Sequence, residues 1–163
     1  MRQVGVRIAI LLSLAGATLG GVALARSSPS RVSFSGPLID STHMGAISFR
    51  GVLGSGRVTK VVHFGWSDVP IACDQGNFHL VAQHFDFAMP VKRSRDPTQN
   101  RVFQGRARAH TGAGRTGKFS WFVVGHFNGR FTKAQGNFQA RGDYSAQATD
   151  CDTGELRWTA KRS

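Results

Sequence analysis

Apolar and polar residues alternate with a period of two along most of the chain after residue 31, and this pattern constrains the fold most. In the last such segment, Leu156, Trp158 and Ala160 share one face, and the charged or hydroxylated residues between them share the other. Successive side chains of a β-strand point to opposite faces, so this period predicts half-buried strands. Helix-favouring Leu, Glu and Lys are scarce, while Gly occurs 20 times. We therefore expect an all-β, antiparallel fold.

The same pattern places the individual strands. The clearest candidates are residues 101–110, 119–127, 134–140 and 156–160, and earlier ones are residues 32–36, 46–51, 58–66, 70–73 and 77–87. Asn128-Gly129 favours a two-residue hairpin turn, because both residue types accept positive φ. The sequence predicts about eight strands, with Phe119, Trp121, Phe138 and Trp158 on buried faces.

Phenylalanine and glycine recur two residues apart in several of these segments. The pairs are Phe34/Gly36, Phe49/Gly51, Phe103/Gly105 and Phe127/Gly129. In a strand, residues two apart lie on one face, so each glycine leaves space beside a ring where an aromatic from a neighbouring strand can lie. Glycine also permits sharp coiling. We expect one small antiparallel β-barrel or a tight β-sandwich.

The N-terminal residues 1–25 have the composition of a secretory signal peptide. A basic head is followed by an uncharged, mostly apolar run and by Ala23-Leu24-Ala25, which predicts cleavage before Arg26. A membrane anchor is the alternative, but the glycine content and the Ala-x-Ala ending argue against it. We expect an exported chain, with a flexible linker at residues 26–31, a β domain at residues 32–163 and no integral membrane segment after cleavage.

The chain has only two cysteines, Cys73 and Cys151. In an exported protein an even, minimal number of cysteines predicts a disulfide. A metal site or a reactive thiol is the alternative. Neither cysteine belongs to a C-x-x-C pair or has a histidine at ligand spacing, so the pattern favours a disulfide over these alternatives.

The predicted mature chain is strongly basic. The leader contains two of the 21 basic residues and none of the nine acids, so 19 basic and nine acidic residues remain, a net charge of +10. Such a surface attracts polyanions. The densest basic region gives a candidate polyanion-binding set of Lys92, Arg93, Arg95, Arg106, Arg108 and Arg115.

Arg106 and Arg108 are two residues apart and so lie on the same polar face of their strand. Phe122 projects from the polar face of the next strand. Basic residues interleaved with an aromatic ring are typical of a stacking groove for nucleic acid. A solvated basic face without a specific partner explains the same residues more simply, so we expect no specific nucleic acid. A polyanionic component of the cell envelope is the partner that the charge suggests.

No residue pattern predicts catalysis. The chain has six histidines, but none has a recognised metal-ligand spacing. A Gly-x-Ser-x-Gly nucleophile motif is missing from the sequence, and the acids Asp150, Asp152 and Glu155 cluster where a turn into the last strand is expected. We expect no enzymatic activity, no cofactor and no metal.

Several modest motifs follow one another in a specific order. They are Phe49–Gly51, Gly56–Val58, Cys73–Gly76, Phe103–Gly105, Phe127–Phe131, Ala134–Phe138 and a closing Cys151-x-x-Gly154-x-Leu156-x-Trp158-x-Ala160-Lys161. In this order the chain resembles a group of small secreted actinobacterial proteins without an assigned function. The segment of residues 84–89 is more apolar than the corresponding segment of that group. The loop of residues 92–100 is longer and more basic than the corresponding loop. The resemblance implies an antiparallel β fold and carries over no catalytic residue.

These observations predict an exported, non-catalytic β domain that binds a partner in the cell envelope or the extracellular space. A barrel that carries a small apolar ligand inside is a second possibility, since small closed barrels can hold one. An inhibitor of an extracellular enzyme is a third. Rings filling the centre of the domain would leave no room for a ligand and would assign the function to the surface.

Overall fold

The computed structural model describes residues 29–39, 45–96, 101–111 and 117–163. The predicted signal peptide, its cleavage site and the first linker residues lie outside these ranges. The described residues form strands and turns without a helix, and all paired strands are antiparallel, which confirms the all-β prediction. Accordingly, this part of the chain contains no helix long and apolar enough to cross a membrane.

Thirteen strands make up the sheet. They are β1 (Arg31–Pro37), β2 (Ala46–Gly54), β3 (Arg57–Ser67), β4 (Val69–Cys73), β5 (Gly76–Leu80), β6 (Gln83–Phe85), β7 (Met89–Pro90), β8 (Lys92–Arg93), β9 (Arg101–Thr111), β10 (Gly117–Phe127), β11 (Lys133–Gly142), β12 (Cys151–Asp152) and β13 (Leu156–Arg162).

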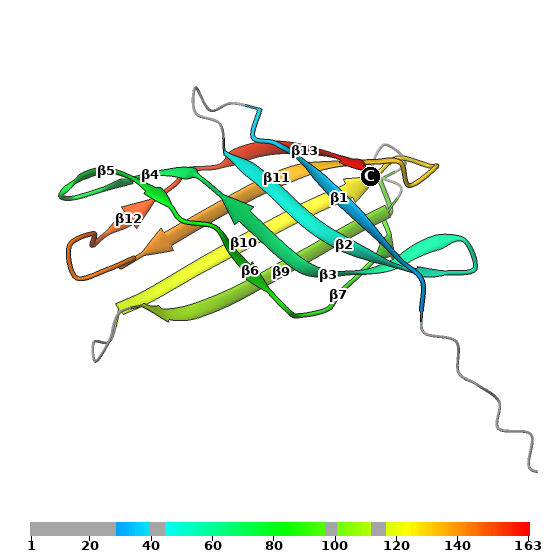
Figure 1. Ribbon diagram of the computed structural model, residues 1–163, viewed down its shortest axis with the longest axis horizontal. Helices are drawn as coiled ribbons and strands as arrows, with labels where there is room; N and C mark the ends of the chain where they lie inside the picture. The colour runs from blue at the N-terminus through cyan, green and yellow to red at the C-terminus, as the bar shows by residue number, and fades with distance from the viewer. Residues whose placement is uncertain (1–28, 40–44, 97–100, 112–116) are drawn as a thin grey trace, which may run out of the picture.

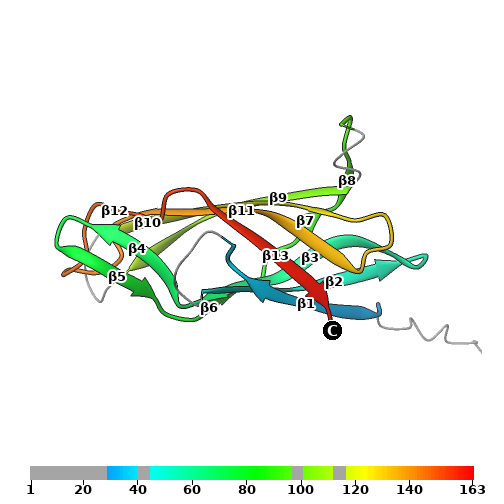
Figure 2. The same ribbon diagram turned by 90° about the horizontal axis from the view of Figure 1, so that it is seen from above.

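The sheet folds over on itself into two layers (Figure 1; Figure 2). β9, β10 and β11 lie in one layer, and β1, β2 and β3 lie in the other, with β13 pairing β11 to β1 across the bend. β11 is the branch point. It pairs with β10 along one edge and shares its other edge between β13 and β12, from which β4 and β5 continue.

The expected barrel is wrong in one respect, because the described sheet is not closed. At the open seam β7 pairs with β3 and β8 pairs with β9, and both strands are only two residues long. They are too short to form a ladder between the two edges. Side chains cover the seam instead, since Phe87 and Met89 both pack against the backbone at Gly105.

The expected number of about eight strands is also too low. Four of the 13 strands have only two or three residues and carry no alternation that a sequence pattern could reveal. The predicted strand 77–87 divides into β5 and β6, because its first half pairs with β4 and its second half pairs with β3. The predicted linker ends earlier than expected, since Arg31 already pairs with Val52 of β2.

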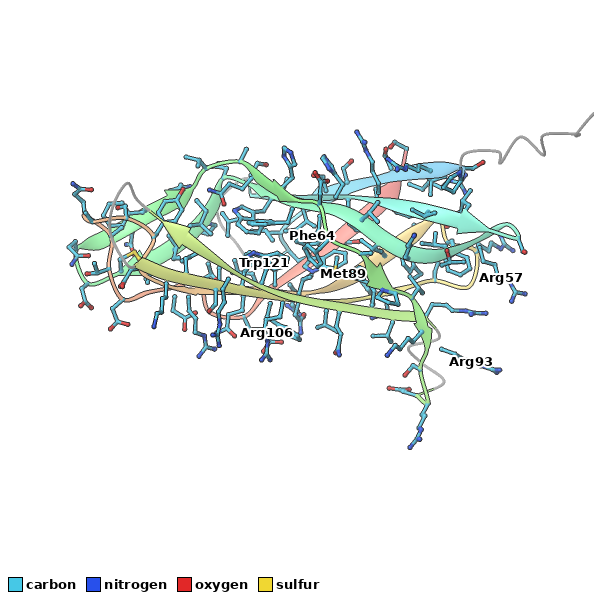
Figure 3. The ribbon with its side chains drawn as sticks, turned by 90° about the horizontal axis from the view of Figure 1, so that it is seen from below. Arg57, Phe64, Met89, Arg93, Arg106 and Trp121 are labelled. Atoms are coloured by element: carbon cyan, nitrogen blue, oxygen red, sulfur yellow. A yellow bond between two sulfur atoms is a disulfide. The ribbon has the colours of Figure 1, made fainter. Side chains whose placement is uncertain are left out.

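Aromatic rings fill the space between the layers, and the four residues predicted to be buried are all at most 2% exposed. Phe64 stacks on Trp121 across the layers with ring centroids 5.9 Å apart, and Figure 3 shows both side chains pointing inward. Glycines on neighbouring strands leave the space that these rings occupy. A Cβ built at Gly125 would lie 2.7 Å from the Trp158 ring, and one at Gly136 would lie 2.8 Å from it.

The predicted two-residue turn at Asn128-Gly129 is wrong. β10 ends at Phe127 and β11 begins at Lys133, so five residues connect them, and Phe127 pairs with Ala134. The Asn128 side chain organises this longer loop, because its Oδ1 accepts hydrogen bonds from the backbone N–H groups of Thr132 and Lys133 at 2.9 and 3.1 Å. Phe131 takes a positive φ of 53° within the loop and is buried against Phe127.

The predicted disulfide is confirmed and joins β4 to β12. Cys73 and Cys151 are 78 residues apart in the sequence. Closing a loop of this length stabilises the fold by about 4 kcal/mol in the chain-entropy model. The bridge holds the β4–β5 hairpin to the end of the β11 layer.

The glycine contacts predict a specific asymmetry between two substitutions. A Cβ at Gly136 would overlap the carbonyl oxygen of Val124, whereas a Cβ at Gly129 would meet nothing within 4 Å. Gly136→Ala should therefore lower the free energy of unfolding by about 2 kcal/mol or more, and Gly129→Ala should change it by less than about 0.5 kcal/mol. Urea denaturation measures both. Equal effects would contradict the packing described here.

Candidate functional site

The outer face of the β9–β10–β11 layer carries the candidate site. β10 directs alternate residues such as Phe119 and Trp121 into the core, so Ser120 and Phe122 between them point outward. The register then extends this outward face to the neighbouring strands. Arg108, Ser120 and Arg141 form one row across the three strands, and Arg106, Phe122 and Gln139 form the next.

These two rows line a groove of about 330 Å³, which we call the arginine groove. Its lining residues are Arg106, Arg108, Ser120, Trp121, Phe122, Gln139 and Arg141. The guanidinium carbon of Arg106 lies 5.7 Å from the centroid of the Phe122 ring, a cation–π contact that orients the charge. Arg108 and Arg141 stand two strands apart, which separates their backbones by roughly 10 Å. An anionic group can therefore lie between two guanidinium groups, above the Ser120 hydroxyl.

The arginine groove keeps its positive charge. Arg106, Arg108 and Arg141 form no ion pair with any carboxylate in the described part of the chain. The acid beside the groove is Asp152, which is opposite Arg141 in the register. Its Oδ1 accepts hydrogen bonds from Gln139 Nε2 at 3.2 Å and from the Gly154 N–H at 2.8 Å.

The structure brings together only part of the predicted basic set. Lys92 and Arg93 form β8, where Lys92 pairs with Val102, so they lie roughly 20 Å from Arg108 along β9. Lys92, Arg93 and Arg95 are all exposed. Arg93 projects from the same side of the molecule as Arg106 (Figure 3). These exposed residues form a second basic area apart from the groove, and Arg115 lies outside the described residues.

The sequence-based set omitted Arg141, which completes the groove. Its alternation with Gln139 does place it on the polar face of the return strand. A two-residue turn at Asn128-Gly129, however, would pair Ser120 with Asn137 and move Arg141 four residues away. The actual five-residue loop sets Ser120 opposite Arg141.

A second polar cluster lies in the other layer, around His63. This residue takes a positive φ of 53° at a register irregularity between β2 and β3. Its Nδ1 is 2.5 Å from Asp86 Oδ1, and its ring centroid is 4.4 Å from that of His84. The histidine spacing in the sequence did not predict this meeting of His63 and His84. In the described residues, no three His, Cys, Asp or Glu side chains gather as a metal site would need.

No protein-family model matches this chain, and neither the curated proteins nor the solved structures include a significant match. The geometry of the arginine groove and of the His63 cluster is therefore the basis for inferring a function. Of the two, only the arginine groove combines a hollow, unpaired charge and an aromatic ring.

The His63 cluster predicts a pH dependence of stability. The hydrogen bond from His63 lowers the pKa of Asp86 below its usual value of 3.8. A depressed carboxyl pKa contributes stability above the unfolded-state pKa, and this contribution is lost as the pH falls through the folded-state pKa. Asp86→Asn should thus melt below the wild type at pH 7, and the difference should shrink below about pH 4. Thermal melts across this range test it, and a constant difference would contradict it.

Proposed function

We propose that this protein is an exported, non-catalytic binding protein whose arginine groove holds a polyanionic component of the cell envelope or the extracellular space. One observation carries the proposal: three arginines, two from β9 and one from β11, line one groove, and none of them forms an ion pair with a carboxylate in the described part of the chain. Unpaired guanidinium groups with fixed spacing favour carboxylate, sulfate or phosphate ligands.

The packing of the interior supports a surface function over a ligand carrier. Rings of Phe49, Phe64, Phe103, Trp121 and Trp158 lie in contact between the layers. A small apolar ligand would have to displace them. The disulfide supports export, because disulfides persist mainly in oxidising compartments outside the cytosol.

The groove lies on the outer face of the sheet and carries three arginines, so its attraction for a polyanion is mainly electrostatic. Each arginine that contacts an anionic group releases condensed counterions from the polymer, which makes affinity fall steeply as salt rises. Arg93 of β8 projects from the same side (Figure 3) and adds to the long-range field. This field extends about 8–10 Å at physiological salt. Binding should be broad in specificity and fast.

A pair of matched double variants tests this proposal. Arg108→Ala with Arg141→Ala removes two charges from the groove, while Arg31→Ala with Arg57→Ala removes two exposed charges elsewhere. The groove variant should elute from heparin at clearly lower salt, and its slope of log affinity against log salt should fall by about two. The control variant should elute close to the wild type. Equal losses would show that the charge is dispersed and would overturn the proposal.

A further inference from the structure

Two further hollows follow the arginine groove along the outer face of β10 and β11, beginning at Asn137, which lies two residues from Gln139 of the groove on the same face of β11. A second hollow of about 190 Å³ includes Asn137 and Arg157 in its lining. A third of about 350 Å³ includes Lys133 and Thr159. Because the second and third hollows share Gln135 and His126, we name the three together the β11 trough. From Arg141 to Lys133 it spans roughly 26 Å of strand.

Neutral amides form the floor of the β11 trough. Gln135, Asn137 and Gln139 are spaced two apart on β11, so their side chains share its outer face. Both ends of the row are basic, with Arg141 at one end and Lys133 at the other. This arrangement combines charge at the ends with a line of groups that both donate and accept hydrogen bonds.

Each amide is already held in place by a neighbour. Gln139 Nε2 donates to Asp152 at 3.2 Å, and Asn137 Nδ2 donates to Glu155. Gln135 Nε2 is 3.1 Å from His126 Nε2. In all three, the contact uses the amide nitrogen, which leaves the carbonyl oxygen available to a ligand. Fixed polar groups lose less conformational entropy on binding.

The chemistry of this row discriminates among polyanions. An amide carbonyl oxygen needs a hydrogen-bond donor from the ligand, and a polyphosphate chain has none at neutral pH. Single-stranded nucleic acid needs a series of aromatic rings for stacking. On the described outer face of β9, β10 and β11, Phe122 is the only Phe, Tyr or Trp, and Arg106 lies over its ring. Sugar hydroxyls, in contrast, both donate and accept.

We infer that the β11 trough binds a linear acidic polysaccharide, whose hydroxyl groups bond to the amides at 135, 137 and 139 while a carboxylate or other anionic group is held by Arg108 and Arg141. This inference deepens the proposed function and rests on it. The polysaccharide lies along β11, and its charge enters the arginine groove.

Two probes of similar charge separate the inference from the proposed function. Polygalacturonate offers carboxylates and hydroxyls, whereas inorganic polyphosphate offers charge alone. Asn137→Ala with Gln139→Ala should weaken binding of polygalacturonate about tenfold and of polyphosphate less than about twofold, because only the polysaccharide uses the amides. Asn77→Ala with Gln147→Ala, two exposed amides outside the trough, should leave both affinities unchanged. Isothermal titration calorimetry at fixed salt measures each affinity.

The remaining outcomes are distinct. Equal effects of the amide variant on both probes, or no effect on either, would overturn the inference and leave polyanion binding in place. Tighter binding of single-stranded DNA than of polygalacturonate by the wild-type protein would overturn it as well. If the wild-type protein binds no probe, the proposed function fails together with the inference.

Discussion

Contacts between aromatic rings and glycines on neighbouring strands determine the rest of this structure. Trp158 lies against Gly125 and Gly136, and a ring atom of Phe34 lies 3.2 Å from where a Cβ of Gly51 would be. These contacts let two twisted layers approach closely although the space between them is filled with large rings. A side chain at such a glycine would push the strands apart. The fold therefore needs both residues of each contact, the aromatic residue and the glycine that makes room for its ring.

The same contacts position the outer surface. Phe119, Trp121 and Val123 of β10 are buried. Because side chains alternate along a strand, Ser120 and Phe122 between them point outward. The register that seats Trp158 opposite Gly136 also aligns β11 with β10 and β13. The arginine groove and the β11 trough thus lie on the outer face of the same strands whose inner face packs into the aromatic core. A slip of one residue in β11 would turn Arg141 inward.

Much of the fold could be predicted from the sequence because alternation, ring–glycine spacing and a cysteine pair are local signals. The open seam could not be predicted from the sequence, because β7 and β8 are only two residues long. Their pairing depends on the path of the chain between β3 and β9. The site was predicted in part. Arg106 and Arg108 share one strand, but the contribution of Arg141 depends on the five-residue loop that the Asn128 side chain organises. The Asn-Gly pair in this loop ordinarily indicates a shorter turn.

If the outer face of the β9–β10–β11 layer binds the polyanion, residue-specific NMR will locate the contact on that face. A two-dimensional ¹H–¹⁵N spectrum of the labelled protein would be followed during titration with a short polygalacturonate. We expect the largest shifts at the backbone amides of Arg106, Arg108, Ser120 and Arg141, with further shifts along β11 to Gln135. Shifts scattered over both layers, or centred on β8 or on the His63 cluster, would contradict it.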